Sequence, residues 1–199
     1  MKVAIADYGA GNLRSLSSAL VRAGADPVVT TEPSVVRESP LALIAGVGHV
    51  ESAAAGLARH GLDEALRERV AAGRTVAGIC VGLQLLFGES EEGGAGLGLL
   101  DGPVRRLAAD CVPHMGWNTL AAGPSALLRG LDGSDVYFAH SYAVHPEDPD
   151  TVTGTVEHGG SVVAAVECGS LAGVQFHPER SAAAGARVLQ NLLRWSRNA

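Results

Sequence analysis

Short apolar segments alternate with longer amphipathic ones through the first eighty residues, and this alternation restricts the fold more than any other feature of the chain. The runs "KVAIAD", "DPVVTT", "PLALIAG" and "RTVAGI" have the length and composition of buried strands, and segments with helical periodicity or turn residues separate them. Strands that alternate with helices pair in parallel, because each helix returns the chain to the starting edge of the sheet. The pattern therefore predicts an open α/β sheet with helices on both faces.

The second half of the chain has a different character. After the acidic, glycine-rich stretch "GESEEGGAGLG", the sequence consists mostly of short strands and turns, and it ends in the amphipathic segment "AAAGARVLQNLLRWSR". We therefore expect a mixed, mostly parallel central sheet with additional antiparallel strands in the second half. A chain of 199 residues with 47% apolar residues is most simply one domain, residues 1–199.

Composition and charge exclude several classes of function. The net charge of −6 and the scattered arginines argue against a nucleic-acid surface. Lys2 is the only lysine, which argues against a Schiff base or pyridoxal phosphate. Each apolar run is interrupted well before the roughly 18 residues that a membrane span needs. The cysteines Cys80, Cys111 and Cys168 form no C-x-x-C pair and no leader segment is recognised, so we expect a cytoplasmic protein.

We expect neither a metal ion nor a cofactor. The "GAGLG" stretch lacks the preceding strand and following helix of a dinucleotide-binding loop. Apart from one histidine discussed below, the histidines show no metal-ligand spacing: His49, His60, His114, His140, His145 and His158.

Cys80 stands between two glycines in "GICVG", residues 78–82, directly after an apolar strand. A strand that turns sharply into a helix can raise a nucleophile above the sheet, and small residues two positions to either side let neighbouring backbone pass close by. The start of a helix also favours a thiolate over a thiol. A buried cysteine in an apolar turn is the ordinary alternative, because free cysteine is among the most buried residue types.

A nucleophilic thiol needs a base, and the base needs an orienting group. The segment "GVQFHPERS" supplies His177 and Glu179, two residues apart around Pro178. In an extended chain such residues point the same way, so the imidazole and the carboxylate can face one side. A polar surface turn is the alternative for this pair.

Taken together, "GICVGLQLLF" and "GVQFHPERS" resemble the two halves of the class I glutamine amidotransferases, which use a Cys-His-Glu triad. Within that family, "DYGAGNLRS", "VPHMGWN" and "YFAHSY" resemble the glutaminase subunits of imidazole glycerol phosphate synthase, an enzyme of histidine biosynthesis. The resemblance implies hydrolysis of L-glutamine to glutamate and ammonia. It makes Cys80 the nucleophile, His177 the general base and acid, and Glu179 the group that orients His177.

The same resemblance implies the surroundings of the substrate. The oxyanion hole would be formed by backbone N–H groups at Val47, Gly48 and Val81. The residues around the bound glutamine would be Gly48, Gln84, Glu92, Ser141 and Tyr142.

The resemblance also implies a partner, a (β/α)8-barrel cyclase subunit that forms a heterodimer with the glutaminase and receives its ammonia. The positions that match the family's docking face are Asn12, Trp117, Tyr137 and Arg180. For Trp117 an ordinary role as a core aromatic is the alternative.

One departure from the family pattern leaves other functions open. The loop that usually begins with proline reads Ala45, Gly46, Val47, Gly48 here, and the loss of a fixed φ predicts a looser oxyanion loop. One alternative is therefore a regulatory binding module that has kept the fold and lost the reaction. A separate alternative, which does not depend on Ala45, is a glutaminase that serves a different synthase, such as that of pyridoxal phosphate or anthranilate.

Overall fold

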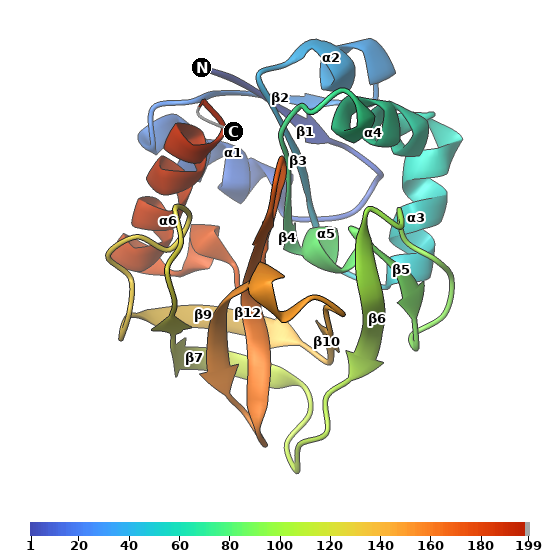
Figure 1. Cartoon of the computed structure of the whole chain (residues 1–199). Coiled ribbons are helices and arrows are strands. Elements are labelled where there is room, and N and C mark those ends of the chain that lie inside the picture. Colours follow the sequence, from blue (N-terminus) through green and yellow to red (C-terminus); the bar gives the residue numbers. More distant parts are fainter. Residues whose placement is uncertain (198–199) are drawn as a thin grey trace.

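The computed structural model describes residues 1–197, which form an α/β fold around an eight-stranded sheet (Figure 1). The strand order is β2-β1-β3-β4-β13-β12-β11-β8. The strands from β2 to β13 in this order are parallel, and the remaining three pair antiparallel. The predicted fold class is confirmed. The strands span Asp26–Thr30 (β2), Lys2–Ala6 (β1), Leu41–Gly46 (β3), Val76–Cys80 (β4), Leu171–Val174 (β13), Ser161–Cys168 (β12), Val152–Glu157 (β11) and Ala121–Ala122 (β8).

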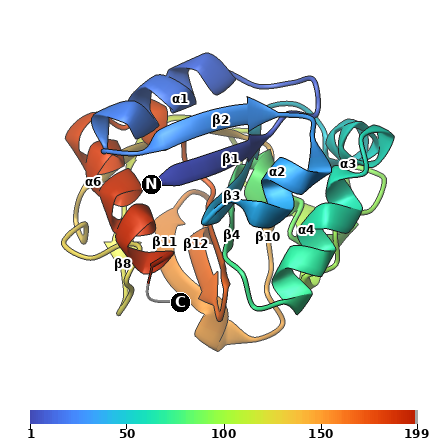
Figure 2. The same cartoon turned by 90° about the horizontal axis from the view of Figure 1, so that it is seen from above.

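Helices cover both faces of this sheet (Figure 2). On one face lie α1 (Leu13–Arg22) and α6 (Ala182–Trp195), which contact each other, and on the other lie α2 (Pro33–Glu38), α3 (Val50–Arg59) and α4 (Leu62–Ala71). Each of these helices buries an apolar side against the sheet or a neighbouring helix.

Two smaller sheets complete the second half. One joins β10 (Tyr142–Val144), β6 (Leu100–Arg106) and β5 (Phe87–Ser90), and the other pairs β7 (His114–Thr119) with β9 (Asp135–His140). The 3₁₀ helices η1 (Pro149–Thr151) and η2 (Pro178–Arg180) lie in the connections. The helix expected after Cys80 is a single turn, α5 (Val81–Gln84), because the apolar residues that follow it enter β5.

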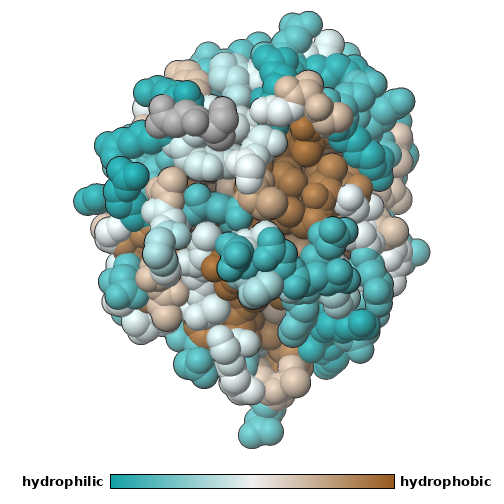
Figure 3. All heavy atoms as spheres, in the orientation of Figure 1, coloured by the Kyte–Doolittle hydropathy of each residue, from teal (hydrophilic) through white to brown (hydrophobic). Residues whose placement is uncertain are grey.

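The core lies in the parallel part of the sheet. Every residue of β3 and β4 is buried, as expected for strands that helices cover on both sides. The face shown in Figure 3 is mostly polar, with an apolar area in a hollow near its centre. Among the described residues, no helix combines the length and hydropathy that crossing a membrane would need.

The glycines on either side of Cys80 are required by close backbone contacts. A Cβ atom on Gly78 would overlap the backbone of Gly82, and a Cβ atom on Gly82 would overlap the carbonyl oxygen of Ile44 in β3. The turn at Cys80 is thus packed against its own strand and against the neighbouring one. This is the close approach that the "GICVG" spacing predicts.

We expect Gly82→Ala to destabilise the fold by about 3 kcal/mol or more, because backbone atoms cannot move aside as a flexible side chain can. Gly88→Ala is the matched control, since its added Cβ would meet only an ordinary contact 3.6 Å away at Gly98. Urea unfolding of the two variants and the wild type measures the difference. Equal stability of the two variants would contradict this description of the turn.

Candidate active site

Three neighbouring parallel strands end at the same edge of the sheet and carry the candidate residues there. Strand β3 leads into Val47 and Gly48, β4 ends at Cys80, and β13 leads within three residues to His177. Gly46 pairs with Cys80, and Val174 pairs with Ile79. The carboxyl ends of parallel strands are where ligands bind in open α/β sheets.

Cys80 has a backbone conformation that only glycine adopts readily. Its φ of 55° and ψ of −112° lie outside the regions that L-residues normally occupy. The residue is 3% exposed, and its Sγ accepts a hydrogen bond from Nε2 of Gln175 at 3.7 Å. Because α5 is one turn long, its dipole is small, and the side chains around Cys80 control its chemistry more than the helix does.

His177 and Glu179 are paired, as predicted. The imidazole Nδ1–H donates to Glu179 Oε1 at 2.9 Å, and each side chain is 7% exposed. Burial disfavours the charged imidazolium, but hydrogen bonds to Cys80 and Glu179 and the negative charges of both outweigh it and raise the pKa of His177 to about 10. With Nδ1 held by Glu179, Nε2 is the ring nitrogen left for the thiol.

Ser181 holds the turn that carries His177 in place through two hydrogen bonds. Its hydroxyl donates to the carbonyl oxygen of His177 at 2.7 Å and accepts from the backbone N–H of Tyr137 at 2.9 Å. The His177 N–H in turn donates to the Tyr137 carbonyl at 2.9 Å. The polar surface turn considered as an alternative is therefore excluded, because this segment is buried and bonded to β9.

A pocket of about 240 Å³ opens beside the thiol. It brings together Cys80 with every residue predicted for the oxyanion hole and the glutamine site, namely Val47, Gly48, Val81, Gln84, Glu92, Ser141 and Tyr142. His177 and Glu179 line a smaller adjoining hollow together with Asn12, Ala45, Gly46 and Val47.

Glu92 is bound to the loop that follows β3. Its Oε1 lies 2.9 Å from His49 Nδ1, and its Oε2 accepts a hydrogen bond from the N–H of Val50 at 2.9 Å. The carboxylate thereby ties the first turn of α3 and the adjacent loop to the β5 side of the pocket. Ala45, which led us to expect a looser loop, lies inside β3 opposite Ile79.

Gln84 and Gln175 join the pocket wall to the nucleophile. Gln84 Nε2 donates to the carbonyl oxygen of Tyr142 at 2.9 Å and to Oε1 of Gln175 at 3.1 Å. Gln175 is fully buried and was missed in the sequence, although it lies two residues before His177. Only the register of β13 against β4 places it beside Cys80.

Three of the four predicted interface residues form one cluster. Trp117 packs edge-on against Tyr137 with ring centroids 5.9 Å apart, and the Arg180 guanidinium lies 4.0 Å above the Tyr137 ring. Trp117 is 55% exposed, which excludes the alternative that it is a core aromatic. Asn12 caps α1 by accepting from the Ser15 N–H at 3.3 Å.

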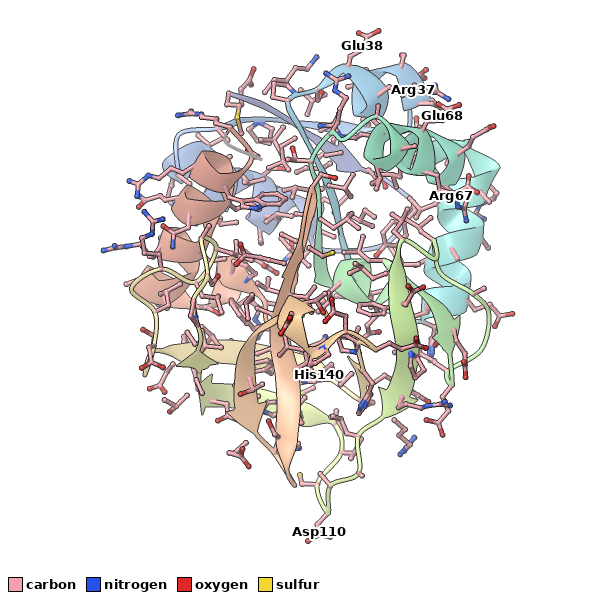
Figure 4. All side chains as sticks on the ribbon, in the orientation of Figure 1. Arg37, Glu38, Arg67, Glu68, Asp110 and His140 are labelled. Atoms are coloured by element: carbon pink, nitrogen blue, oxygen red, sulfur yellow. The ribbon has the colours of Figure 1, made fainter. Side chains whose placement is uncertain are left out.

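Two further histidines are buried next to the pocket, and one of them, His140, lines it. His140, which Figure 4 shows in the interior of the lower half, is 6% exposed, and His114 is 4% exposed. Desolvation by burial lowers the pKa of each to about 4. Within residues 1–197, His, Cys, Asp and Glu side chains do not gather into a group of three or more suited to a metal ion.

Comparison with known proteins identifies the family. The model of the family "Glutamine amidotransferase class-I" matches residues 4–194, almost the whole chain. The chain belongs to this family. Solved structures share the fold: a protein described as "Crystal structure of glutamine amidotransferase" has a TM-score of 0.79 at 20% identity, covering 98% of both chains. The "Structure of PurLQS from Thermotoga maritima" has a TM-score of 0.77 at 20% identity, with the same coverage.

Closer relatives of this amidotransferase carry one name. The chain is 48% identical to "Imidazole glycerol phosphate synthase subunit HisH" of Moorella thermoacetica over 194 residues, which is 95% of this chain and 92% of the relative. It is 45% identical to the protein of the same name from Mycolicibacterium paratuberculosis, over 95% of each chain.

The buried neutral histidines of this amidotransferase predict acid sensitivity. A histidine whose folded pKa is depressed binds its proton only in the unfolded chain between pH 6.5 and about 4, so stability falls as the pH falls through that window. The charged or titratable groups that act on His140 are His114, His158 and His177.

We expect His140→Asn to reduce the slope of unfolding free energy against pH in this window, by at most about 1.4 kcal/mol per pH unit. Urea unfolding of wild type and variant at several pH values between 4 and 6.5 measures it. An unchanged slope would mean that His140 titrates normally in the folded protein.

Proposed function

We propose that this chain is the glutaminase subunit of imidazole glycerol phosphate synthase, and that it hydrolyses L-glutamine to glutamate and ammonia through a thioester on Cys80. The observation that carries the proposal is the convergence of Cys80, His177 and Glu179 at the carboxyl edge of the sheet, beside a pocket lined by polar groups. Kinship with proteins named as subunits of that synthase supports the choice of pathway. Residues 1–199 would form one amidotransferase domain.

The proposed reaction uses His177 in two directions. Because its pKa is raised by Cys80 and Glu179, His177 carries a proton near neutral pH and pairs with the Cys80 thiolate. The thiolate attacks the side-chain amide carbon of glutamine, the C–N bond breaks, and His177 gives its proton to the departing ammonia. His177 then takes a proton from water, which attacks the thioester, releases glutamate and restores the thiolate. Glu179 keeps the Nδ1 proton in place throughout.

The negative oxygen of each tetrahedral intermediate needs N–H donors. We assign these to the backbone of Val81, directly after the nucleophile, and to the loop at Val47 and Gly48, all of which line the pocket. Such donors are typically worth about 3 kcal/mol each. The binding of the glutamine itself is assigned to residues of the same pocket, namely Gly48, Gln84, Glu92, Ser141 and Tyr142.

The proposed partner is a (β/α)8-barrel cyclase subunit that forms a heterodimer with this chain. Ammonia becomes protonated in neutral water and then cannot act as a nucleophile, so it must pass to the acceptor under cover. The exposed cluster of Trp117, Tyr137 and Arg180 has the residue types that anchor interfaces, and Asn12 lines the hollow beside His177. We place the complex in the cytoplasm, where the three free thiols would stay reduced.

Cys80→Ala in the reconstituted complex tests the reaction. We expect the glutamine-dependent cyclase reaction to fall by more than a thousandfold, because no other group can form the thioester. The reaction supplied with ammonium salt should remain, since it bypasses Cys80. Cys168→Ala, which removes an exposed thiol, is the control and should leave both reactions unchanged. Persistent glutamine-dependent turnover in Cys80→Ala would refute the proposed mechanism, and wild-type chain without turnover would favour the regulatory module.

Trp117→Ala tests the docking face. We expect the dissociation constant for the cyclase to rise about thirtyfold, as for a central aromatic of an interface, and cyclase stimulation of glutamine hydrolysis to weaken at limiting cyclase. Val29→Ala, which truncates another exposed apolar residue, is the matched control. Surface plasmon resonance with immobilised cyclase measures both variants. Equal affinities would remove Trp117 from the interface, and binding to a different synthase would change the proposed acceptor.

A further inference from the structure

An unbroken series of hydrogen bonds connects β7, the strand that carries Trp117, to the sulfur of Cys80. It begins where Asn118 Nδ2 lies 3.1 Å from His114 Nε2, and His114 Nδ1 lies 3.0 Å from His140 Nε2. His140 Nδ1 lies 2.8 Å from the carbonyl oxygen of Tyr142. Gln84 donates to that same carbonyl and to Gln175, and Gln175 donates to Cys80.

The chemistry of these groups fixes the direction of each bond. A carbonyl oxygen can only accept, so His140 must carry its proton on Nδ1 and leave Nε2 as an acceptor. His114 must then donate from Nδ1, and its Nε2 accepts from the amide of Asn118. Asn118 is itself held, because Nδ2 also donates to the Glu157 carbonyl and Oδ1 accepts from the Thr119 N–H. Both histidines are thus neutral and have the same tautomer.

The surroundings hold the two imidazoles rigidly in place. His114 is stacked between Phe138, at a centroid distance of 4.5 Å, and His158, at 4.1 Å. Phe138 also packs against His140 and against Phe176, the neighbour of His177. The lowered pKa values of His114 and His140 agree with neutral rings. A second proton on His140 would face the Nδ1–H of His114, and a second proton on His114 would face the amide N–H of Asn118.

The Tyr142 carbonyl is the point at which this series meets the substrate pocket. It accepts from His140 on one side and from Gln84 on the other, and His140, Tyr142 and Gln84 all line the pocket. Without the His140 donor, the peptide after Tyr142 would be held at this oxygen by Gln84 alone. A carbonyl that can shift gives Gln84 a less fixed acceptor, so the Gln84 amide could turn. Gln175 would then lose a fixed partner beside Cys80.

We propose that His140 and His114 are positioning residues for the glutaminase reaction, which fix the Tyr142 carbonyl and through it the Gln84 side chain that faces the substrate. The inference rests on the proposed function and adds His140 and His114, which take no part in the bond-making and bond-breaking steps. Because alternate residues of a strand face opposite sides, β7 presents Met115 and Trp117 outward and His114 and Asn118 inward. A partner bound to the outer face would therefore hold the strand on which the series begins.

The test is the effect on substrate affinity, measured in the complex with the cyclase. His140→Leu removes the donor and should raise KM for glutamine about tenfold, with kcat changed less than threefold. His140→Asn places an amide nitrogen near the former Nδ1 and should return KM to within about threefold of the wild type. His145→Leu, which replaces an exposed histidine, is the matched control. A purely structural role would lower the amount of active protein and leave KM unchanged.

If the His140→Leu protein fails to fold, a second pair of variants and a spectroscopic measurement test the same proposal. His114→Leu should raise KM relative to His114→Asn in the same direction as at position 140. The difference should be smaller, because one more hydrogen bond separates His114 from the Tyr142 carbonyl. In the wild-type chain, long-range ¹H–¹⁵N spectra should show His114 and His140 as neutral Nδ1–H tautomers from pH 7 down to about pH 4.

Each outcome decides the inference. Unchanged KM in the Leu variants, equal KM in the Leu and Asn variants, or Nε2–H tautomers in the spectra would overturn it. Calorimetric titration with glutamine gives the same comparison without turnover. A wild-type chain that binds glutamine but releases no glutamate would contradict the proposed reaction. The positioning role would still be decided in that case, by the glutamine affinities of the variants measured by calorimetry.

Discussion

The close approach of β3 and β4 at the turn after Cys80 is the constraint on which the site depends. Gly78 and Gly82 let the backbone pass where a Cβ atom would overlap it, and this packing holds Cys80 at a φ of 55°. The strained turn ends the strand abruptly and places the sulfur at the carboxyl edge of the sheet, where the residue stays buried beside the pocket. Because β3 and β13 flank β4 in parallel, their following residues reach the same place, so one sheet edge gathers the nucleophile, its base and the loop beside them.

Burial alone does not determine the charge of the histidines around the site. His177 and His140 are both nearly inaccessible, yet the pKa of His177 is raised to about 10 and that of His140 is lowered to about 4. The difference lies in their partners, since His177 faces a carboxylate and a thiol, whereas His140 faces a carbonyl and other imidazoles. One interior thus holds a charged ring suited to proton transfer and neutral rings suited to a fixed hydrogen-bond series.

Sequence patterns predicted the features that depend on local chemistry. The alternation of strands and helices predicted the mostly parallel sheet, and the "GICVG" spacing predicted the tight turn. The His-Pro-Glu spacing predicted the pairing of His177 with Glu179. Sequence patterns did not predict the contacts that depend on strand register. Gln175 reads as an ordinary strand residue until β13 is placed beside β4. His114 and His140 come together only through the pairing of β7 with β9. The helix after Cys80 is only one turn long, and the sequence does not indicate where it ends, because a short apolar run fits a helix and a strand equally well.

Folding makes Cys80 the reactive thiol, although it is the least accessible of the three cysteines. The most direct measurement is mass spectrometry of the chain in complex with the proposed cyclase partner after treatment with the glutamine analogue diazo-oxo-norleucine. Selective modification of buried Cys80, slowed in a His177→Gln variant, is the result expected from the Cys80–His177–Glu179 geometry. Modification of the exposed Cys111 and Cys168 with Cys80 left intact would contradict it.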